Sequence, residues 1–421
     1  MKVGIIGSGG REHSICQSLK LSKNVSKLYC FPGNAGTSLI AENINIDLDN
    51  FENLKNFIIE NKIEIVVIGP EKPLVKGLTD YLENFSIKVF GPNKIASQLE
   101  GSKIFTKNLC KKFNIPTANF GIYNSPSKAV DFLNNCNFPI VVKADGLAAG
   151  KGVYICENYD QSKLAIKEIF GGKFGEAKNI LIEEFLRGEE MSFFVISDGK
   201  TFKHFGTAQD HKRVFEGDKG KNTGGMGAYS PSRLENDDLN EKIINKIINP
   251  TFEGLKHYKT SFKGFLYAGL MIVKNEPFLI EYNVRMGDPE CQTILPKLKS
   301  DFFNIIQACT SENLESTKID WYDDKCLSIV LCSNGYPDKF NNFVEIKNLS
   351  KINLNENEYI YHAGTILKNE NLFSNGGRVL NFVVRSKDFE QSRNQALKLI
   401  KKLNWENGFY RKDIGFKVID K

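Results

Sequence analysis

Short apolar runs alternate with helical patterns through the first 90 residues, and this alternation limits the possible folds. The runs at 2–6, 27–31, 63–68 and 88–90 predict strands, and amphipathic stretches near 13–20, 49–61 and 74–84 predict helices. Such alternation is typical of a doubly wound parallel sheet. The loops GSGGREH, PGNAGTS and GPEKPLVKG follow these strands, so we expect them at one sheet edge, where ligands normally bind.

The opening glycine loop has to be weighed against a dinucleotide fingerprint. That motif needs G-x-G-x-x-G and an acid closing the second strand. Counting from Gly7, the sixth position is Glu12, and the second strand ends in Phe31-Pro32-Gly33 without an acid. A nicotinamide site is therefore disfavoured. Backbone N–H groups at a helix N-terminus, with Arg11 beside them, still suit a phosphate.

A second glycine-rich loop separates two apolar runs in PIVVKADGLAAGKGVYIC, residues 139–156. It does not match the P-loop, because Lys151 is followed by Gly152 and a strand rather than by a helix. Glycines between antiparallel strands suit a flap that folds over phosphates; a plain hairpin loop is the alternative. Lys143 favours the flap, since a lysine on the inner face of an apolar strand needs a fixed anionic partner.

An acidic strand is predicted in FLIEYNVRMGDPE, residues 278–290. Residues two apart share a face, so Glu281, Asn283 and Arg285 should point together, with Ile280, Tyr282 and Val284 packed behind them. Carboxylate and amide oxygens suit Mg²⁺, and an arginine fork suits a carboxylate or phosphoryl group. A solvated amphipathic edge strand is the alternative interpretation.

Further strands are expected at 180–184, 191–197, 263–273 and 277–285, with helices at 102–113 and 161–170. The segment ILIEEFLRGEE predicts a strand edge with nearby acids, and QDHKR, residues 209–213, precedes a glycine-rich loop. The last 95 residues or so resemble a separate small α/β module, with strands at 325–333, 361–367 and 378–385 and a helix at 389–403.

Composition sets the class of protein. The chain has 421 residues, 41% hydrophobic and 25% charged, which predicts an ordinary globular protein of two to four domains. A net charge of +6 makes no case for nucleic acid or an anionic membrane, and no apolar run approaches a membrane span. Nine scattered cysteines without a C-x-x-C pair are typical of a cytoplasmic protein, which is the location we expect.

Taken together, the flap hairpin, the preceding lysine, the E-E-F-L segment and the E-x-N strand resemble the ATP-grasp superfamily. Within it the chain resembles the phosphoribosylamine–glycine ligase family. The motifs that carry this likeness occur in order and reach residue 380: GSGGREH, PGNAGT, GPEKPLVKG, LEGSKIFTK, KADGLAAGKGV, EEFLRGEE, QDHKR, NTGGMGAYSP, GFLYAGLM, EYNVRMGDPE, HAGT and SNGGRVL.

The resemblance implies an α/β fold of three parts. They are an N-terminal Rossmann-like (pre-ATP-grasp) substrate domain over 1–102, an ATP-grasp domain over 103–312 with a mobile β-hairpin flap subdomain at about 120–190, and a small C-terminal α/β domain over 325–421. It also implies ligation of glycine to 5-phosphoribosylamine through glycyl phosphate, the second step of purine synthesis, with ATP as co-substrate and Mg²⁺ or Mn²⁺ as metal. We expect no nucleic-acid or membrane partner, and at most a transient contact with the preceding enzyme of the pathway.

Site residues follow from the resemblance, motif by motif. The implied metal ligands are Glu281 and Asn283, and the implied reaction-centre residues are Arg285, Asp288 and Lys212. The implied ATP-binding residues are Lys103, Lys143, Gly150, Lys151, Gly152, Glu183, Glu184, Leu186 and Glu190, with Glu183, Glu184 and Leu186 as the adenine hinge and Glu190 as the ribose acid. The implied residues around the ribose phosphate and the junction of the two sites are Gly9, Gly10, Arg11, Glu71, Asp210 and Arg213.

Three other functions remain as alternatives. A formate-using or carboxylating ATP-grasp enzyme, or a biotin carboxylase, would share the nucleotide half, although the GSGGREH and PGNAGT loops argue against it. A non-catalytic nucleotide-binding module would lack the metal acid or the flap lysine, yet Glu281 and Lys151 are both present. An NAD-dependent oxidoreductase is disfavoured by Glu12.

Overall fold

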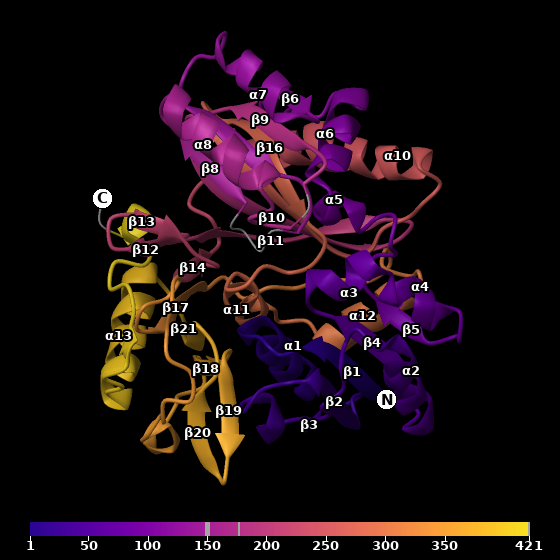
Figure 1. The fold of residues 1–421 in the computed structure, drawn as a ribbon. Helices are drawn as coiled ribbons and strands as arrows, with labels where there is room; N and C mark the ends of the chain where they lie inside the picture. The colour runs from indigo at the N-terminus through magenta and orange to yellow at the C-terminus, as the bar shows by residue number, and fades with distance from the viewer. Residues whose placement is uncertain (148–151, 176, 420–421) are drawn as a thin grey trace.

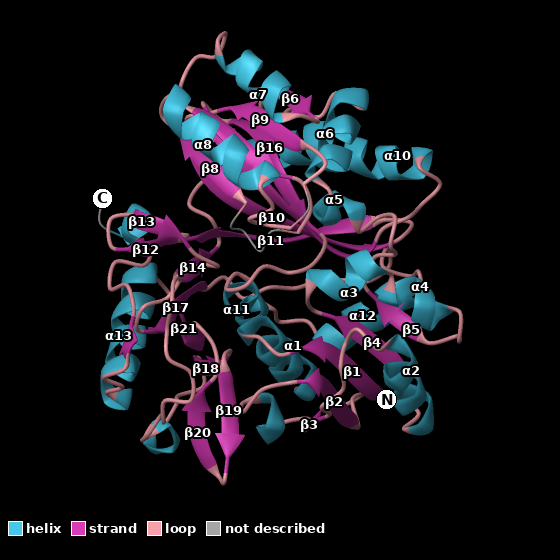
Figure 2. Cartoon of the chain, in the orientation of Figure 1, coloured by secondary structure: helices cyan, strands magenta, loops and turns pink. Residues whose placement is uncertain are grey.

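A computed structural model describes residues 1–147, 152–175 and 177–419 of the chain. Figure 1 shows the N-terminal sheet and the C-terminal strands side by side in the lower half of the view, with a smaller sheet at the top. Figure 2 shows helices covering the faces of these sheets. No helix in the described part of the chain is long and apolar enough to cross a membrane.

The predicted doubly wound sheet is confirmed. Five parallel strands lie in the order β3-β2-β1-β4-β5, and β1 and β4 at its centre are almost wholly buried. The helix expected at 74–84 is two helices, because Gly77 takes the left-handed conformation (φ 90°) that ends the first of them. The elements are β1 (Lys2–Gly7), α1 (Gly10–Lys20), β2 (Lys27–Pro32), β3 (Glu42–Asn43), α2 (Phe51–Glu60), β4 (Ile65–Ile68), α3 (Glu71–Lys76), α4 (Leu78–Glu83) and β5 (Lys88–Phe90).

A four-stranded sheet in the order β6-β9-β7-β8 contains the predicted hairpin. Strands β7 and β8 pair antiparallel, with Val142 opposite Tyr154. The hairpin is thus observed, whereas its movement as a flap stays a prediction. This part comprises α5 (Gln98–Gly101), α6 (Lys103–Lys112), β6 (Phe120–Tyr123), α7 (Pro126–Leu133), β7 (Ile140–Ala144), β8 (Val153–Cys156), α8 (Tyr159–Phe170) and β9 (Ile180–Glu184).

The central sheet runs β16-β15-β10-β11-β14-β17-β21-β18, with β22 beside β17. Its first half comprises β10 (Glu189–Asp198), β11 (Phe202–Asp210), β14 (Gly227–Ser230), β15 (Lys263–Val273) and β16 (Glu276–Asn283). The hairpin β12 (Arg213–Phe215) and β13 (Lys219–Asn222) projects from it. The helices of this half are α9 (Asp237–Ile243), a π-helical turn (Ile244–Ile248), α10 (Asn249–His257), α11 (Cys291–Ile294) and α12 (Phe302–Thr310).

The C-terminal part extends the central sheet and adds a small two-stranded sheet, β19-β20. Strand β17 pairs with β14, placing Leu327 opposite Tyr229, so one sheet runs through both regions. The strand expected at 361–367 is divided at residues 363–364 into β18 and β19. The elements are β17 (Lys325–Ser333), β18 (Glu358–His362), β19 (Thr365–Lys368), β20 (Asn371–Ser374), β21 (Arg378–Ser386), α13 (Phe389–Leu403), β22 (Gly408–Phe409) and α14 (Phe416–Ile419).

Buried hydrogen bonds join the N-terminal sheet to the C-terminal part around His13. The backbone N–H of His362 donates to Nδ1 of His13 at 2.8 Å. The side-chain amide of Asn34 donates to the carbonyls of Ser8 and His362, both at 2.8 Å. Burial lowers the pKa of His13 to about 3 and that of His362 to about 4, so both rings are neutral near pH 7.

Because His13 is buried in this contact between the N-terminal sheet and the C-terminal part, the free energy of unfolding depends on pH. The pKa of His13 is about 3 when folded and 6.5 when unfolded, so its contribution is complete above pH 6.5 and is lost as pH falls. His13→Asn keeps an oxygen that can accept the His362 N–H but cannot be protonated. From pH 7.5 to 4.5, we expect the unfolding free energy of the parent to drop by about 2 kcal/mol more than that of the variant.

Urea titrations at the two pH values measure this difference. His257→Asn, at an exposed histidine, is the control, and its pH dependence should match that of the parent. Equal pH dependence in the parent and in His13→Asn would contradict the prediction.

Candidate functional site

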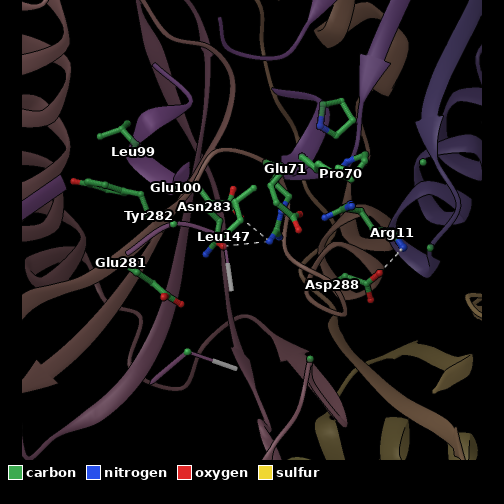
Figure 3. A pocket seen from close by; sticks show the side chains of 18 of the residues that line it. Arg11, Pro70, Glu71, Leu99, Glu100, Leu147, Glu281, Tyr282, Asn283 and Asp288 are labelled. Carbon is green, nitrogen blue, oxygen red and sulfur yellow. Dashed lines mark hydrogen bonds and ion pairs between the residues drawn. The ribbon is translucent and has the colours of Figure 1, made fainter. Parts of the chain in front are cut away.

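A cleft lies where the N-terminal sheet, the four-stranded sheet and strand β16 meet (Figure 3). Its main cavity has a volume of about 850 Å³. A second cavity of about 260 Å³, which we call the hinge cavity, reaches Phe185 and Leu186. The two cavities share the wall residues Lys143, Val153, Glu183, Thr223, Gly224, Ile280, Glu281, Asn283, Arg285 and Asp288, and therefore form one continuous cleft.

A buried carboxylate bridges two lysines at the hinge side of this cleft. Oxygen Oε2 of Glu183 lies 2.9 Å from Nζ of Lys143, and its Oε1 lies 3.2 Å from Nζ of Lys107. All three side chains are buried. The anionic partner that Lys143 was predicted to need is therefore Glu183. The neighbouring Glu184 is exposed, and its carboxylate accepts the N–H of Asn119 at 2.9 Å.

Sequence reasoning missed Lys107. It lies one helical turn after Lys103 on α6, so the spacing in LEGSKIFTK could have indicated a second lysine on the same face. Burial lowers the pKa of Lys107, although the charge of Glu183 opposes that shift. Lys107 also donates to the hydroxyl of Thr117 at 2.5 Å, which fixes its position.

Lys103 contacts the glycine-rich loop that follows β7. Its ammonium donates to the carbonyl of Gly146 at 2.9 Å, and Oδ1 of Asp145 accepts from the hydroxyl of Ser102 at 3.1 Å. Burial lowers the pKa of Lys103, and Glu281 acts in the opposite direction. Gly152 lines the main cavity. The predicted flap residues Gly150 and Lys151 lie outside the described residues.

The predicted face of the acidic strand is formed, with one correction. Glu281 and Asn283 line both cavities; Tyr282 is 2% exposed and contributes only to the wall of the main cavity. Ile280, however, lines the cleft instead of packing behind it. A β-bulge explains this: Gly269 pairs with Glu281 and Leu270 with Leu279, so Ile280 is the extra residue and the alternation slips by one.

The carboxylate of Glu281 makes no hydrogen bond or ion pair within the described part of the chain, and it faces the cavity (Figure 3). Asn283 presents an amide on the same face. Nowhere among the described residues do three or more His, Cys, Asp or Glu side chains gather as a metal site. The donor set fits Mg²⁺, which typically takes one or two protein carboxylates and completes its shell with phosphate oxygens and water.

Arg285 lies between two carboxylates. Its guanidinium donates to Glu71 at 2.9 Å, to Glu100 at 2.8 Å and to the amide oxygen of Asn283 at 3.3 Å. Burial disfavours the charge of Arg285, but the two acids outweigh it and raise its pKa. Burial raises the pKa of Glu100, whereas for Glu71 the charges of Arg285 and Arg11 outweigh burial and lower the pKa. Sequence reasoning missed Glu100.

The N-terminal glycine loop is held by carboxylates. Glu12 accepts the N–H of Gly9 at 2.6 Å and Nε of Arg11 at 2.5 Å. The N–H of Arg11 donates to Asp288 at 3.2 Å. Two of the backbone donors that we expected to be free for an anion are therefore engaged. Gly9 and Arg11 line the main cavity, whereas Gly10 is buried at the start of α1 and is not among the lining residues.

Asp288 connects several residues at the N-terminal glycine loop end of the cleft. It accepts from Gln292 at 2.8 Å and lies 3.3 Å from Nη1 of Arg378, which also donates to the carbonyl of Gly224 at 2.6 Å. Burial opposes ionisation of Asp288, but the charges of Arg378 and Arg11 outweigh it and lower its pKa. Sequence reasoning quoted Arg378 within SNGGRVL without assigning it a role.

The QDHKR segment lies at the hinge cavity. Lys212 pairs with Glu190 at 2.6 Å, and both line that cavity together with Asp210. Burial raises the pKa of Asp210 to about 7. Arg213 is not brought to the cleft: its guanidinium donates to the carbonyl of Gly220 across the β12–β13 hairpin.

Comparison with known proteins identifies the relatives of this chain. Three family profiles match in order: Phosphoribosylglycinamide synthetase N domain over residues 1–100, its ATP-grasp (A) domain over 101–291 and its C domain over 326–417. A phosphoribosylamine–glycine ligase of Brucella melitensis is 44% identical over 422 residues, covering 100% of this chain and 99% of the relative. One of Clostridium acetobutylicum is 39% identical, covering 99% of each chain.

Solved structures agree with these relatives. The crystal structure of a phosphoribosylamine–glycine ligase from Thermotoga maritima superposes with a TM-score of 0.86 at 32% identity, covering 98% of this chain and 100% of that one. A biotin carboxylase from Campylobacter jejuni has a TM-score of 0.75 at 13% identity, covering 100% of this chain and 95% of that one, which is a likeness of fold alone. The chain belongs to the phosphoribosylamine–glycine ligase family, whose central domain has the ATP-grasp fold.

Proposed function

We propose that this chain joins glycine to 5-phosphoribosylamine at the expense of ATP, within the cleft described above. A carboxylate oxygen of glycine attacks the γ-phosphorus of ATP, forming glycyl phosphate and releasing ADP. The amine nitrogen of phosphoribosylamine then attacks the acyl carbon, the C–O bond to phosphate breaks, and the nitrogen loses a proton. The products are glycinamide ribonucleotide, ADP and phosphate.

The observation that carries this proposal is the distribution of charges along one cleft. Lys103, Lys143 and the free carboxylate of Glu281 lie at the hinge side, whereas Arg11 and Arg378 lie at the N-terminal glycine loop. Two anionic substrates can thus enter from opposite ends and meet near Arg285. Acyl phosphate chemistry needs such positioning and charge stabilisation more than a protein nucleophile.

We place the base and ribose of the nucleotide in the hinge cavity and its phosphates where this cavity joins the main cavity. The base would lie by Glu184 and Leu186, with Glu190 at the ribose hydroxyls and Lys103, Lys143 and Gly152 at the phosphates. Lys143 retains ammonium donors for this purpose, because Glu183 uses only part of its capacity. We therefore assign Glu183 to holding two lysines rather than to contacting adenine. Gly150 and Lys151 stay predicted flap contacts.

Glu281 and Asn283 would hold Mg²⁺ or Mn²⁺. When bound, this metal would neutralise phosphate charge during phosphoryl transfer. The protein's own part is to keep both oxygens on one face of β16, with buried Tyr282 fixing the strand behind them.

We place the amine substrate at the N-terminal glycine loop. Gly9, Arg11 and Glu71 would surround its ribose phosphate, whereas Arg285 would face the acyl phosphate; Gly10, which does not line the cavity, would support the turn beneath them. Asp210 and Asp288 would face the glycine ammonium, and Lys212 lines the hinge cavity with them. A binding role for Arg213, a cytoplasmic location and a transient contact with the enzyme that supplies the amine stay predictions.

The function is tested by ADP release with ATP, Mg²⁺ and phosphoribosylamine generated in situ. We expect release only when glycine and the amine are both present, because acyl transfer must follow phosphoryl transfer for turnover. Bicarbonate and formate replace glycine in the comparison reactions. Release that depends on either of them and not on glycine would sink the proposal.

Glu281→Ala removes the proposed metal carboxylate. We expect kcat/KM to fall on the order of 10²-fold, equivalent to about 2–4 kcal/mol of transition-state stabilisation. Glu276→Ala is the matched control: it lies on the same strand but pairs with surface lysines at the other end. The kinetic constants are measured at steady state across a Mg²⁺ titration. Activity of Glu281→Ala within threefold of the parent would show that Glu281 is not a metal ligand.

Glu183→Gln removes the negative charge between Lys107 and Lys143 while keeping the side-chain shape. Two buried ammonium groups are then left without a counter-charge, so the variant should lose about 3 kcal/mol of unfolding free energy. Glu184→Gln, one residue along the strand and exposed, should change stability by less than about 1 kcal/mol. Urea unfolding at pH 7.5 compares them, and similar losses in both variants would refute the assignment.

A further inference from the structure

Arg411 is the most deeply buried arginine among the described residues, and the proposed mechanism does not use it. Its side chain is 1% exposed. It begins the segment RKDIGFK, residues 411–417, which we call the clamp segment. Figure 1 shows this end of the chain beside the β12–β13 hairpin. Arg411 lines neither cavity of the cleft.

The guanidinium of Arg411 is matched by two acids from different segments. Nε and Nη2 donate to Asp413 at 2.8 and 2.7 Å, and Nη1 donates to Asp218, in the turn of the hairpin, at 2.8 Å. Nη1 also donates to the carbonyl of Arg213 at 3.0 Å. The N–H of Gly217 donates to Asp413 at 2.8 Å. A buried charge with this many charge-assisted hydrogen bonds fixes the groups around it.

The clamp segment also holds the ring of His211. Its Nε2 accepts the N–H of Gly415 at 3.0 Å, and its Nδ1 lies 3.5 Å from Oδ1 of Asp218 and 3.4 Å from Nη2 of Arg411. Burial lowers the pKa of His211, which keeps the ring neutral. Backbone bonds fix the same residue: the N–H of His211 donates to Gly227 at 2.8 Å. His211 is thus fixed both through its ring, by the clamp segment, and through its backbone, by β14.

The residues held in this way adjoin the hinge cavity. Lys212, next to His211, pairs with Glu190 at 2.6 Å. The carbonyl of Lys212 accepts the N–H and the hydroxyl of Thr223 at 2.8 and 2.9 Å. Thr223 and Gly224 line both cavities. The hairpin that joins Lys212 to Thr223 is the element that Arg411 and Asp413 bind.

We propose that Arg411 is a positioning residue for nucleotide binding, acting through Lys212 and the 222–225 loop. The planar fork engages Asp413, Asp218 and the Arg213 carbonyl in three directions, which a lysine cannot reproduce. Loss of the guanidinium removes its bonds to Asp218 and to the Arg213 carbonyl and leaves Asp218 paired with Lys417. The loop then no longer keeps its place in the nucleotide cavity. This inference rests on the proposed function, because the proposed function places ATP in that cavity.

The test compares Arg411→Ala with a matched variant at another buried arginine. Arg385 is 9% exposed, lies in the same sheet on β21 and bonds to Asn357, away from the cleft. We expect Arg411→Ala to raise the KM for ATP at least about fivefold and to leave the KM for phosphoribosylamine within about twofold. Arg385→Ala should leave both within about twofold. A KM does not depend on the fraction of folded enzyme, so it separates positioning from lost stability.

Two further measurements keep the inference decisive. Asp218→Asn, at a partly exposed residue, removes the negative charge that pairs with Arg411 and Lys417 at little risk to folding, and should also raise the KM for ATP. A few millimolar guanidinium ion should restore ATP binding to Arg411→Ala and not change Arg385→Ala. If Arg411→Ala does not fold, the KM for ATP of Asp218→Asn alone tests the inference.

The inference is overturned if ATP binding by Asp218→Asn equals that of the parent, or if Arg385→Ala loses as much as Arg411→Ala. Titration calorimetry with ATP and Mg²⁺ supplies the binding constants without glycine or amine. A parent that binds ATP but fails the glycine-dependence assay would refute the proposed function, whereas a parent-like ATP affinity in Asp218→Asn would refute the role of Arg411. The two failures are therefore distinguishable.

Discussion

The guanidinium of Arg285 ties together the three segments that form the cleft. It follows the acidic strand β16, and it bonds to Glu71 at the start of α3 and to Glu100 in α5. Two acids around one cation leave a net negative charge, and Glu100 also accepts the N–H of Val284 at 2.8 Å. The N-terminal sheet, the connecting helices and the proposed metal strand therefore have one relative position, fixed by charge-assisted bonds rather than by apolar packing alone.

This arrangement explains why acids outnumber lysines in a cleft proposed to bind anions. Glu183 keeps two lysine ammonium groups close together that would otherwise repel, and Glu12 and Asp288 do the same for the arginine end. Every cation that the structure describes at the walls has a partner in the protein, so it is held in place before a substrate arrives. A bound phosphate must compete with these carboxylates for the cations, which lowers its affinity. Because the cations are already held in place, their side chains lose little conformational entropy when the substrate binds.

Much of the fold could be predicted because local pattern decides it. The limits of β9, β15, β17 and α13 are those expected from apolar runs and caps, since the three strands are apolar runs buried over most of their length and α13 begins at the cap Asp388. The candidate site was predicted less completely. Lys143 was expected to need an acid, but nothing local indicated that Glu183 is this acid. Ile280 was placed on the wrong face because a bulge depends on the neighbouring strand, and strict alternation cannot show it.

The residues that sequence reasoning missed share a physical cause. Glu100, Arg378 and Arg411 act on partners between 90 and 198 residues away in the chain, and each lies in a segment whose local pattern is ordinary. Because one sheet continues from β14 into β17, the C-terminal strands bring Arg378 to the cleft, and the segment after β22 brings Arg411 to the β12–β13 hairpin. The C-terminal part is therefore a wall of the site and a support for it. A motif search finds the groups that face the substrates, whereas the groups that hold them in place become visible only when distant segments are seen in contact.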